Sequence, residues 1–466
     1  MIGDVTSPDL SWIEPWIQRI RSHVAVRTAD NVLIRMPNEC FKLNESGARL
    51  MHFMLNGGSL GDVLAARNHD PEAVDQINGF FTAVRLMLDH RMCERFQSDA
   101  VQRVNYRLGY IDLPILAELA VTHRCNIRCR FCYGSCVCST RETGSRMHRR
   151  TELSTRRFER IIRIIRHDAG VPSMSFTGGE PMLRNDIFRL VRYAAVTMGM
   201  RVNLITNGTL ITTDTALRLR DSGLASAQVS IESPDPAVHD VLTQVPGSFH
   251  RSETGVRALR DAGILVHVHA TICSENAQSL QDMPRFVQDL KLDRFSLNMM
   301  IPIGRGKGND LAVRYREMDA IVRPIIERAR VAGVTFMWYA PTPICLFNPV
   351  ALGLGNKGCA ACEGLLAIDP DGNILPCSSW PEPLGSLLKT DFRTIWFSDR
   401  ARTLRMKHAA PEQCTGCSDF AVCQGACPLY FDAFPEDRAE VICRTAGLEM
   451  EGLHDVLSHA SGISRA

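Results

Sequence analysis

The sequence predicts an α/β fold built around a parallel β-sheet, either a barrel or an open sheet, over residues 112–340. In this region, short apolar stretches suited to buried strands alternate about six times with amphipathic helical segments. Polar or glycine-rich residues follow several of the predicted strands. Because the chemistry of such folds lies at the carboxyl ends of the strands, we expect the functional site there.

The sequence of residues 1–105 predicts a small domain followed by a linker. The segment "NVLIRMPNECFKLN" (31–44) is expected to form two short strands around a Pro-Asn-Glu turn. Three segments with apolar residues three and four positions apart follow, and each predicts a helix. A hairpin with three helices is a winged-helix-like arrangement.

Seven stretches between residues 112 and 340 have the composition of strands. We expect most of the segments between them to form crossover helices, such as "STRRFERIIRIIRH" (154–167), whose apolar residues share one face. The predicted strands lie at 115–123, 173–179, 201–208, 226–233, 265–272, 294–303 and 334–340.

The charge and the apolar runs of the sequence indicate which classes of binding partner to expect. The chain has 53 Lys and Arg residues and 51 Asp and Glu residues, which gives a net charge of +2. The overall charge therefore does not favour binding to nucleic acid or to an acidic membrane surface. We find no signal-peptide pattern and no apolar run long enough to span a bilayer. We therefore expect a cytoplasmic protein that binds neither nucleic acid nor a membrane.

The region 345–445 is rich in cysteine, glycine and proline and poor in regular apolar patterns, so we expect metal sites to hold it together. Residues 446–466 predict a tail. The chain has 17 cysteines. In a reducing compartment, clustered cysteines indicate metal or redox chemistry rather than a disulfide framework.

Five of these cysteines lie in "CNIRCRFCYGSCVC" (125–138). The first three, Cys125, Cys129 and Cys132, form a CxxxCxxC motif. Three thiolates on one short loop suit a cubane iron-sulfur cluster with one open iron, whereas structural zinc usually takes four ligands in paired units. Cys136 and Cys138 are assigned no role.

This motif, with Tyr133 after it, resembles that of the radical S-adenosylmethionine (SAM) enzymes. The resemblance extends to "GGEP" (178–181), "TNG" (206–208) and "SIES" (230–233), each at a strand end. It implies a partial (β/α)6 barrel, a 4Fe-4S cluster that binds SAM, and an external electron donor of the flavodoxin or ferredoxin type. The cofactor-binding residues that it implies are Tyr133, Gly178, Gly179, Glu180, Pro181, Asn207, Ser230 and Glu232.

A second cysteine pattern lies near the C-terminus, where Cys362, Gly372 and Cys377 precede a CxxCxxxxxCxxxC motif. This spacing resembles the SPASM extension of radical SAM enzymes, which implies two auxiliary 4Fe-4S clusters. By that resemblance, one cluster takes Cys362, Cys377 and Cys427 with an upstream cysteine, Cys359 or Cys345, of which we prefer Cys359. The other takes Cys414, Cys417, Cys423 and Cys443. A zinc-binding domain is the alternative.

The N-terminal unit resembles the precursor-recognition element of ribosomal peptide biosynthesis, similar to the PqqD-type chaperone of pyrroloquinoline quinone assembly. Such an element binds a leader peptide as an added strand. The alternative is a docking or dimerisation module.

The three parts together resemble maturases of the sactipeptide and ranthipeptide type, with a weaker likeness in "GRGKGND" (304–310). The implied function is the oxidative modification, such as cross-linking, of a ribosomally made precursor peptide by a 5'-deoxyadenosyl radical. One alternative is a radical enzyme for a small molecule such as a tetrapyrrole or a redox cofactor precursor. Another is a non-catalytic adaptor with a metal scaffold. The sequence singles out no proton acceptor.

Overall fold

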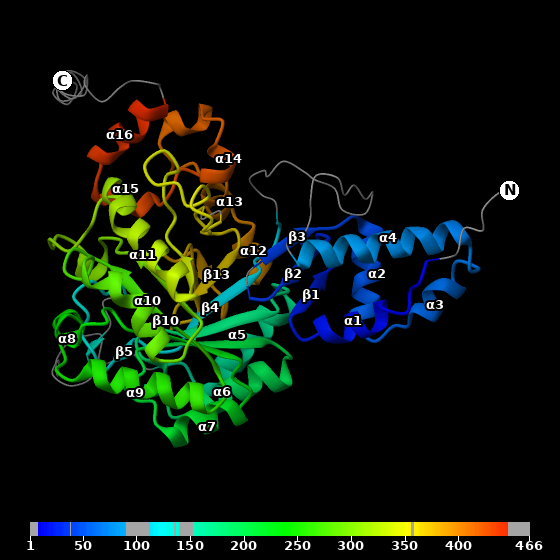
Figure 1. Cartoon of the computed structure of the whole chain (residues 1–466), viewed down its shortest axis with the longest axis horizontal. Helices are drawn as coiled ribbons and strands as arrows, with labels where there is room; N and C mark the ends of the chain where they lie inside the picture. The colour runs from blue at the N-terminus through cyan, green and yellow to red at the C-terminus, as the bar shows by residue number, and fades with distance from the viewer. Residues whose placement is uncertain are drawn as a thin grey trace.

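Figure 1 shows the computed structural model, which describes residues 8–37, 39–89, 111–134, 137–138, 152–355 and 358–445. A small N-terminal domain (blue) packs against one side of a central α/β domain (cyan to yellow-green), and the C-terminal region (orange to red) lies on another side.

The N-terminal domain combines a three-stranded antiparallel sheet with helices that bury Trp16, Met51 and Phe81 between them. The three predicted helices are present, and the side chains of Asn44, Ser59 and Asp70 cap their first turns. The predicted hairpin is present, and an earlier four-residue strand that was not predicted extends it to a three-stranded sheet. The elements are α1 (Ile13–Ile20), β1 (Val24–Arg27), β2 (Val32–Arg35), β3 (Glu39–Lys42), α2 (Glu45–Leu55), α3 (Leu60–Ala65) and α4 (Pro71–Leu88).

A buried ion pair attaches this domain to the central one. The Nε atom of Arg27 lies 2.7 Å from Oδ1 of Asp30, and both side chains are buried. The same guanidinium donates hydrogen bonds to the carbonyl oxygens of Leu113 (2.9 Å) and Pro114 (2.7 Å), just before the central sheet begins. Beside this contact lies a small apolar cluster of Val32, Ile34, Ile111 and Ile115.

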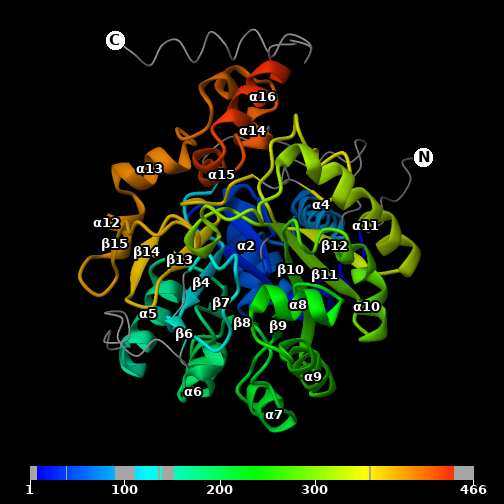
Figure 2. The same ribbon diagram turned by 90° about the vertical axis from the view of Figure 1, so that its left-hand side faces the viewer.

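All seven predicted strands of the central domain are present, and they run parallel to one another. Their order is β12-β11-β10-β9-β8-β7-β4, and within the described residues β12 does not pair with β4, so the sheet forms an open, partial barrel (Figure 2). The strands are β4 (Leu116–Ala120), β7 (Ser173–Thr177), β8 (Arg201–Thr206), β9 (Ser226–Ser230), β10 (Leu265–Ile272), β11 (Arg294–Met299) and β12 (Thr335–Trp338).

Crossover helices cover the outer face of this sheet (Figures 1 and 2). Buried apolar residues such as Leu119, Leu204 and Val268 belong to the core that the sheet shares with the helices. Polar residues occupy the alternate positions, as Glu118 and His269 do, so they face the barrel interior. The helices are α5 (Thr155–His167), α6 (Ile187–Arg192), α7 (Thr213–Asp221), α8 (Pro236–Thr243), α9 (Ser248–Asp261), α10 (Met283–Asp289) and α11 (Met318–Ala332).

The sheet continues beyond β4 into the C-terminal region. Strand β13 (Leu365–Ile368) pairs in parallel with β4, and β14 (Asn373–Leu375) and β15 (Gly385–Ser386) follow in antiparallel fashion. The sequence did not predict these strands, because each has at most four residues and depends on its neighbour for pairing.

Short helices complete the C-terminal region. Tyr430 packs on Tyr315 of the central domain with ring centroids 3.8 Å apart, and Arg314 forms an ion pair with Asp437 at 2.7 Å. No helix within the described residues is long and apolar enough to cross a membrane. The helices are α12 (Phe392–Trp396), α13 (Asp399–Arg405), α14 (Phe420–Cys423), α15 (Pro428–Ala433) and α16 (Glu436–Thr445).

The buried pair between Arg27 and Asp30 leads to a stability prediction. Arg27→Ala leaves the Asp30 carboxylate buried without its partner, so we expect the free energy of unfolding to fall by about 3–5 kcal/mol. Arg49→Ala removes the exposed partner of Glu45 and is expected to cost at most about 1 kcal/mol. Chemical denaturation of both variants measures the difference. Equal losses would show that the Arg27 contact does not anchor the domain.

Candidate functional site

The three cysteines of the CxxxCxxC motif lie close together after β4. Cys125 is buried, and Cys129 and Cys132 are half-buried. Burial raises the pKa of the Cys125 thiol to about 12, and burial together with Glu232, Cys132 and Cys125 raises the pKa of Cys129 well above its ordinary value. These mutual effects place the three sulfur atoms within electrostatic reach of one another.

Backbone hydrogen bonds from two other segments hold the cysteine loop. The amides of Arg128 and Arg130 donate to carbonyl oxygens at the end of α8, at 2.9 and 3.0 Å. On the other side, the Arg305 amide donates to the Cys132 carbonyl oxygen at 3.0 Å. Gly304, with φ of +57°, packs so closely that a Cβ would overlap with the backbone of Cys132 and Tyr133. The segment 304–310, a weak signal in the sequence, therefore supports the cysteine loop.

The "GGEP" segment pairs with the backbone that leads into Cys125. The amides of Gly179 and Glu180 donate to the carbonyl oxygens of Thr122 and Arg124, both at 2.8 Å. A Cβ on Gly179 would overlap with the Arg124 carbonyl group, and one on Gly178, whose φ is +136°, would lie 2.6 Å from the Thr122 oxygen. Both positions therefore require glycine for close backbone approach.

Glu180 is fully buried and connects two strand ends. Its carboxylate accepts hydrogen bonds from the Met182 amide (3.0 Å), the Thr206 hydroxyl (2.8 Å) and the Asn207 amide (2.9 Å). Burial raises the pKa of the Glu180 carboxyl, and these three donors oppose that shift. Pro181 begins the short 3-10 turn that follows.

Asn207 lies beside the first cysteine. Its Nδ2 donates to Oδ1 of Asn126 at 2.9 Å and lies 4.0 Å from the Cys125 sulfur. Its Oδ1 accepts from the amide (3.0 Å) and hydroxyl (2.6 Å) of Thr209. The "TNG" segment therefore contacts the cysteine loop directly.

The remaining predicted cofactor residues surround the same loop. Ser230 ends β9, and Glu232, two residues later, accepts a hydrogen bond from the Thr271 amide at 2.9 Å. Burial raises the pKa of Glu232 to about 7, although the hydrogen bond from the Thr271 amide opposes the shift. Tyr133 is the most exposed of the set.

A polar group inside the barrel was not singled out from the sequence. His269 of β10 shares a 2.8 Å hydrogen bond with the Ser296 hydroxyl of β11, and the Tyr339 ring stacks on the imidazole with centroids 6.2 Å apart. Burial lowers the pKa of His269 to about 4, although Asn298 and Ser296 oppose the shift. The strand pairing could have suggested this group, because His269 and Ser296 lie opposite each other at inward positions of neighbouring strands.

Glu118 of β4 also lies inside the barrel, where it accepts a hydrogen bond from the Ser378 hydroxyl of the C-terminal region. Burial raises the pKa of its carboxyl.

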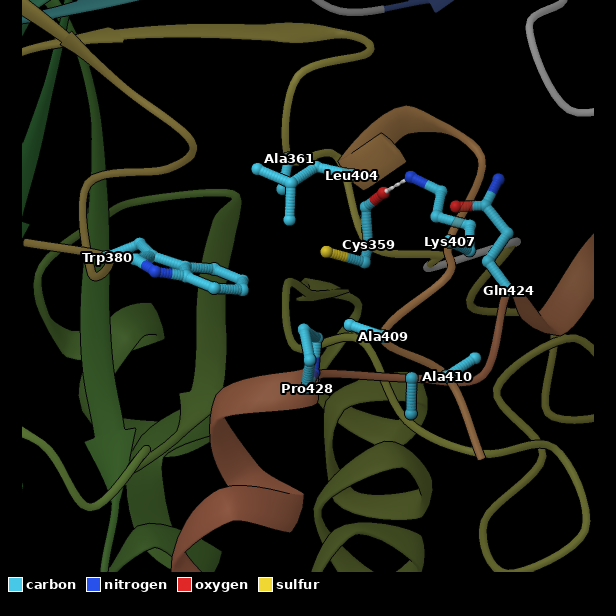
Figure 3. Close-up of a pocket in the computed structure, with 10 residues that line it drawn as sticks. Cys359, Ala361, Trp380, Leu404, Lys407, Ala409, Ala410, Gln424 and Pro428 are labelled. Carbon is cyan, nitrogen blue, oxygen red and sulfur yellow. Dashed lines mark hydrogen bonds between the residues drawn. The ribbon is translucent and has the colours of Figure 1, made fainter. Parts of the chain in front are cut away.

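The structure divides the described C-terminal cysteines into two groups. In the first group, Cys359 lines a cavity together with Ala361, Ala426 and Pro428, which are sequence neighbours of Cys362 and Cys427. Figure 3 shows the Cys359 sulfur in a cavity between Trp380 and Pro428. Of the two upstream cysteines, Cys359 is therefore the one that joins this group.

The second group consists of Cys345, Cys414, Cys417 and Cys423, which line one cavity. The side chain of Cys443 and the whole of Cys136 lie outside the described residues. For Cys138 the structure describes the backbone, which pairs opposite Cys125.

These groups have the chemistry of iron-sulfur sites. The cysteine loop offers three thiols and each C-terminal group offers four, and thiolates are the ligands of four-iron clusters. Within the described residues, no three His, Cys, Asp or Glu side chains converge tightly enough to hold one metal ion. A four-iron cluster is wider than one ion and accepts thiols set farther apart.

Two family models match the chain. Residues 119–287 match the radical SAM superfamily, and residues 359–418 match SPASM, an iron-sulfur cluster-binding domain. The predicted SAM, 4Fe-4S cluster and auxiliary iron-sulfur clusters are thereby confirmed, and the alternatives of a zinc domain and a non-catalytic adaptor are wrong.

Curated relatives fall into two functional classes. An AdoMet-dependent heme synthase of Nitratidesulfovibrio vulgaris is 28% identical over 330 residues, which are 66% of this chain and 85% of the relative. A PqqA peptide cyclase of Xanthomonas axonopodis pv. citri is 27% identical over 341 residues, which are 70% of this chain and 86% of the relative.

Solved structures share the fold. Streptococcus suis SuiB bound to its precursor peptide SuiA superposes with a TM-score of 0.65 at 18% identity, covering 88% of this chain and 95% of SuiB. The enzyme anSMEcpe with bound AdoMet gives 0.54 at 16% identity, covering 74% of this chain and 99% of anSMEcpe. Residues 112–466 make up less than four fifths of the chain, so the match to SuiB must extend into the N-terminal domain.

The glycine-cradled cysteine loop at the strand ends, the two further cysteine groups and the two family models agree with one another. The chain therefore carries a radical S-adenosylmethionine domain and, nearer its C-terminus, a SPASM iron-sulfur domain.

Proposed function

We propose that this enzyme oxidatively modifies, by cross-linking, a ribosomally made precursor peptide that it binds through its N-terminal domain. The observation that carries the proposal is the N-terminal sheet, docked on the barrel through the buried Arg27–Asp30 pair. The match to the SuiB structure with bound precursor peptide covers 88% of this chain, which is more than the barrel and SPASM domains. The match to anSMEcpe covers 74% of this chain and 99% of anSMEcpe.

The N-terminal sheet offers an edge for a peptide strand. Strand β3 (Glu39–Lys42) pairs with β2 on one side and with no other described strand. Its four residues are half-buried, so its outer edge is within reach of a partner. An extended peptide adds to such an edge through main-chain hydrogen bonds. The PqqA peptide cyclases among the relatives support a peptide substrate.

We assign different parts of cofactor binding to different residues of the site. We assign the open-iron cluster to Cys125, Cys129 and Cys132, and the binding of SAM to the backbone and side chains around them, with Gly178 and Gly179 allowing close approach. Glu180 already accepts hydrogen bonds from three protein donors, so its first task is to fix this backbone, and a contact to the SAM ammonium would use a remaining lone pair. When bound, the cluster and SAM supply the 5'-deoxyadenosyl radical that takes a hydrogen atom from the substrate.

An oxidative cross-link then requires the substrate to lose one proton and one electron. His269 is placed to accept the proton, because its buried imidazole is neutral at pH 7 and faces the barrel interior. The first SPASM cysteine group is placed to accept the electron. Ser378, the residue after Cys377, donates a hydrogen bond to Glu118 of the barrel wall, so this group lies beside the barrel interior. An external flavodoxin or ferredoxin would reduce the first cluster.

The heme synthases among the relatives favour a second candidate, a tetrapyrrole substrate. In that case the same chamber would hold a macrocycle, and the N-terminal domain would serve another purpose. The two candidates predict different reactive substrates.

The substrate experiment uses the anaerobically reconstituted full chain with SAM, a reductant and one substrate at a time. The peptide arm uses a short peptide encoded beside the gene, and the second arm uses a propionate-bearing porphyrin. We expect the peptide to lose two hydrogens per event by mass spectrometry, and a variant with proline at Phe41 in β3 to bind it more weakly, because proline disrupts strand pairing. Turnover of the porphyrin with an unchanged peptide would replace our proposal with the second candidate.

Gly179→Ala tests the cofactor site. The added Cβ would overlap with the Arg124 carbonyl group, so we expect it to displace the cysteine loop and to reduce 5'-deoxyadenosine formation at least about 100-fold. Gly79→Ala is the control, since no atom lies within 4 Å of a Cβ there. Liquid chromatography measures the nucleoside. Wild-type rates from Gly179→Ala would contradict the assigned packing.

His269→Gln tests the proton acceptor. Glutamine can still hydrogen bond to Ser296 but cannot accept a proton at neutral pH, so we expect product formation to fall about 10²–10⁴-fold. Cleavage of SAM should continue, uncoupled from product. His267→Gln, two residues deeper on the same strand, is the control and should retain coupling. An equal product-to-nucleoside ratio in the wild type and His269→Gln would rule out this role.

A further inference from the structure

Arg405, the last residue of α13, is a buried cation beside Cys362 of the first cysteine group. Only 9% of its surface is exposed. Its Nε atom donates a hydrogen bond to the carbonyl oxygen of Cys362 at 2.8 Å, and its Nη2 atom donates to that of Trp396 at 3.1 Å. The guanidinium carbon lies 5.1 Å from the centroid of the Trp396 ring. These contacts hold the positive charge against a residue that carries one of the thiols.

No carboxylate in the described part of the chain forms an ion pair with Arg405, and both of its hydrogen-bond acceptors are neutral carbonyl groups. The carboxylate of Glu363, next to Cys362, pairs instead with the ammonium of Lys407 at 2.9 Å, and both side chains are buried. That pair is neutral overall, so Arg405 adds one positive charge to this part of the core. A buried charge is costly unless an opposite charge offsets the lost hydration. An anionic centre at the neighbouring cysteines would supply that offset.

Lys407 brings a second buried cation to the same group. Its ammonium donates a hydrogen bond to the carbonyl oxygen of Cys359, and both residues line one cavity (Figure 3). Lys407 follows α13 with φ of +59°, a left-handed conformation that favours glycine at this position after a helix. The amide of His408 closes the helix end by donating to the Thr403 carbonyl oxygen at 3.3 Å. A lysine at a position suited to glycine indicates a role for its side chain.

The first cysteine group provides the matching negative charge. The Cys362 amide donates to the carbonyl oxygen of Pro376 at 3.1 Å, which places Cys362 beside the residue that precedes Cys377. Four thiolates around a four-iron cluster give the centre a net negative charge, which grows when the cluster accepts an electron. Nearby cations therefore stabilise the reduced form more than the oxidised form. The cysteines of the group are Cys359, Cys362, Cys377 and Cys427.

We propose that Arg405 raises the reduction potential of the iron-sulfur cluster held by the first cysteine group, and that Glu363 limits this rise by neutralising Lys407. Net charge near a cluster is one of the factors that set its potential. A higher potential makes the group a better acceptor for the electron that oxidative cross-linking releases. That purpose rests on the proposed function, whereas the charge effect does not.

A redox titration of the anaerobically reconstituted full chain, followed by electron paramagnetic resonance, tests the role of Arg405. Cys125→Ala, Cys129→Ala and Cys132→Ala are included so that only the auxiliary clusters titrate. We expect Arg405→Met to reduce the equilibrium constant for reduction of one auxiliary cluster at least about tenfold, which is about 59 mV for one electron. Arg405→Lys keeps the charge and should keep the potential. Arg402→Met removes an exposed cation from the same helix and is the matched control.

Glu363→Gln tests the same charge effect in the opposite direction. The variant leaves Lys407 without this carboxylate partner, so we expect the potential of the same cluster to rise. A loosened structure would move Arg405→Met and Glu363→Gln in the same direction, because greater access of solvent to the cluster acts alike in both. Opposite shifts therefore identify charge, rather than packing, as the cause.

Equal potentials in Arg405→Met and the parent chain would overturn the proposal, as would an equal fall in Arg405→Lys or in Arg402→Met. If Arg405→Met fails to fold or to hold iron, Glu363→Gln decides. A higher potential in Glu363→Gln then supports the proposal, and an unchanged or lower one overturns it. No substrate and no SAM enter these measurements, so a failure of the peptide proposal would leave their outcome unchanged.

Discussion

The arrangement of the SAM site depends on one buried carboxylate, that of Glu180. Removing an ionised carboxylate from water is costly unless hydrogen bonds replace those of the solvent. Three donors from Met182, Thr206 and Asn207 do so here, and hydrogen bonds to a charged group contribute about 1.5–3 kcal/mol each. Because Thr206 ends β8 and Asn207 follows it, the carboxylate fixes the ends of β7 and β8 relative to each other.

The cysteine loop takes its position from this arrangement. The amides of Gly179 and Glu180 pair with the backbone that leads into Cys125, and Asn207 reaches the same loop from β8. Gly304 and Arg305 hold its far end. Apart from the side-chain contact of Asn207 with Asn126, these contacts are made by the main chain, which explains why glycines cluster here.

The SPASM region is part of the central sheet rather than a separate attachment. β13 pairs with β4, and Ser378 donates a hydrogen bond to Glu118 on the inner face of β4. Cys377 is the residue before Ser378, so this hydrogen bond brings one cysteine of the SPASM region beside the inner face of β4.

Apart from α1, whose buried face was not predicted, the sequence alone predicted the seven parallel strands, the other N-terminal helices, the crossover helices and the cysteine spacings of the cluster loop and the SPASM region. These are local signals, because an apolar period or a ligand spacing is complete within a few residues of the chain. Strands β1, β13, β14 and β15 were missed for the opposite reason, since their partners rather than their own residues stabilise them. Only the tertiary structure brought His269, Ser296 and Tyr339 together, assigned Cys359 to the first cysteine group and placed Cys345 beside the second. These contacts join residues far apart in the chain, and no spacing along a sequence records a distance that the folded backbone alone sets.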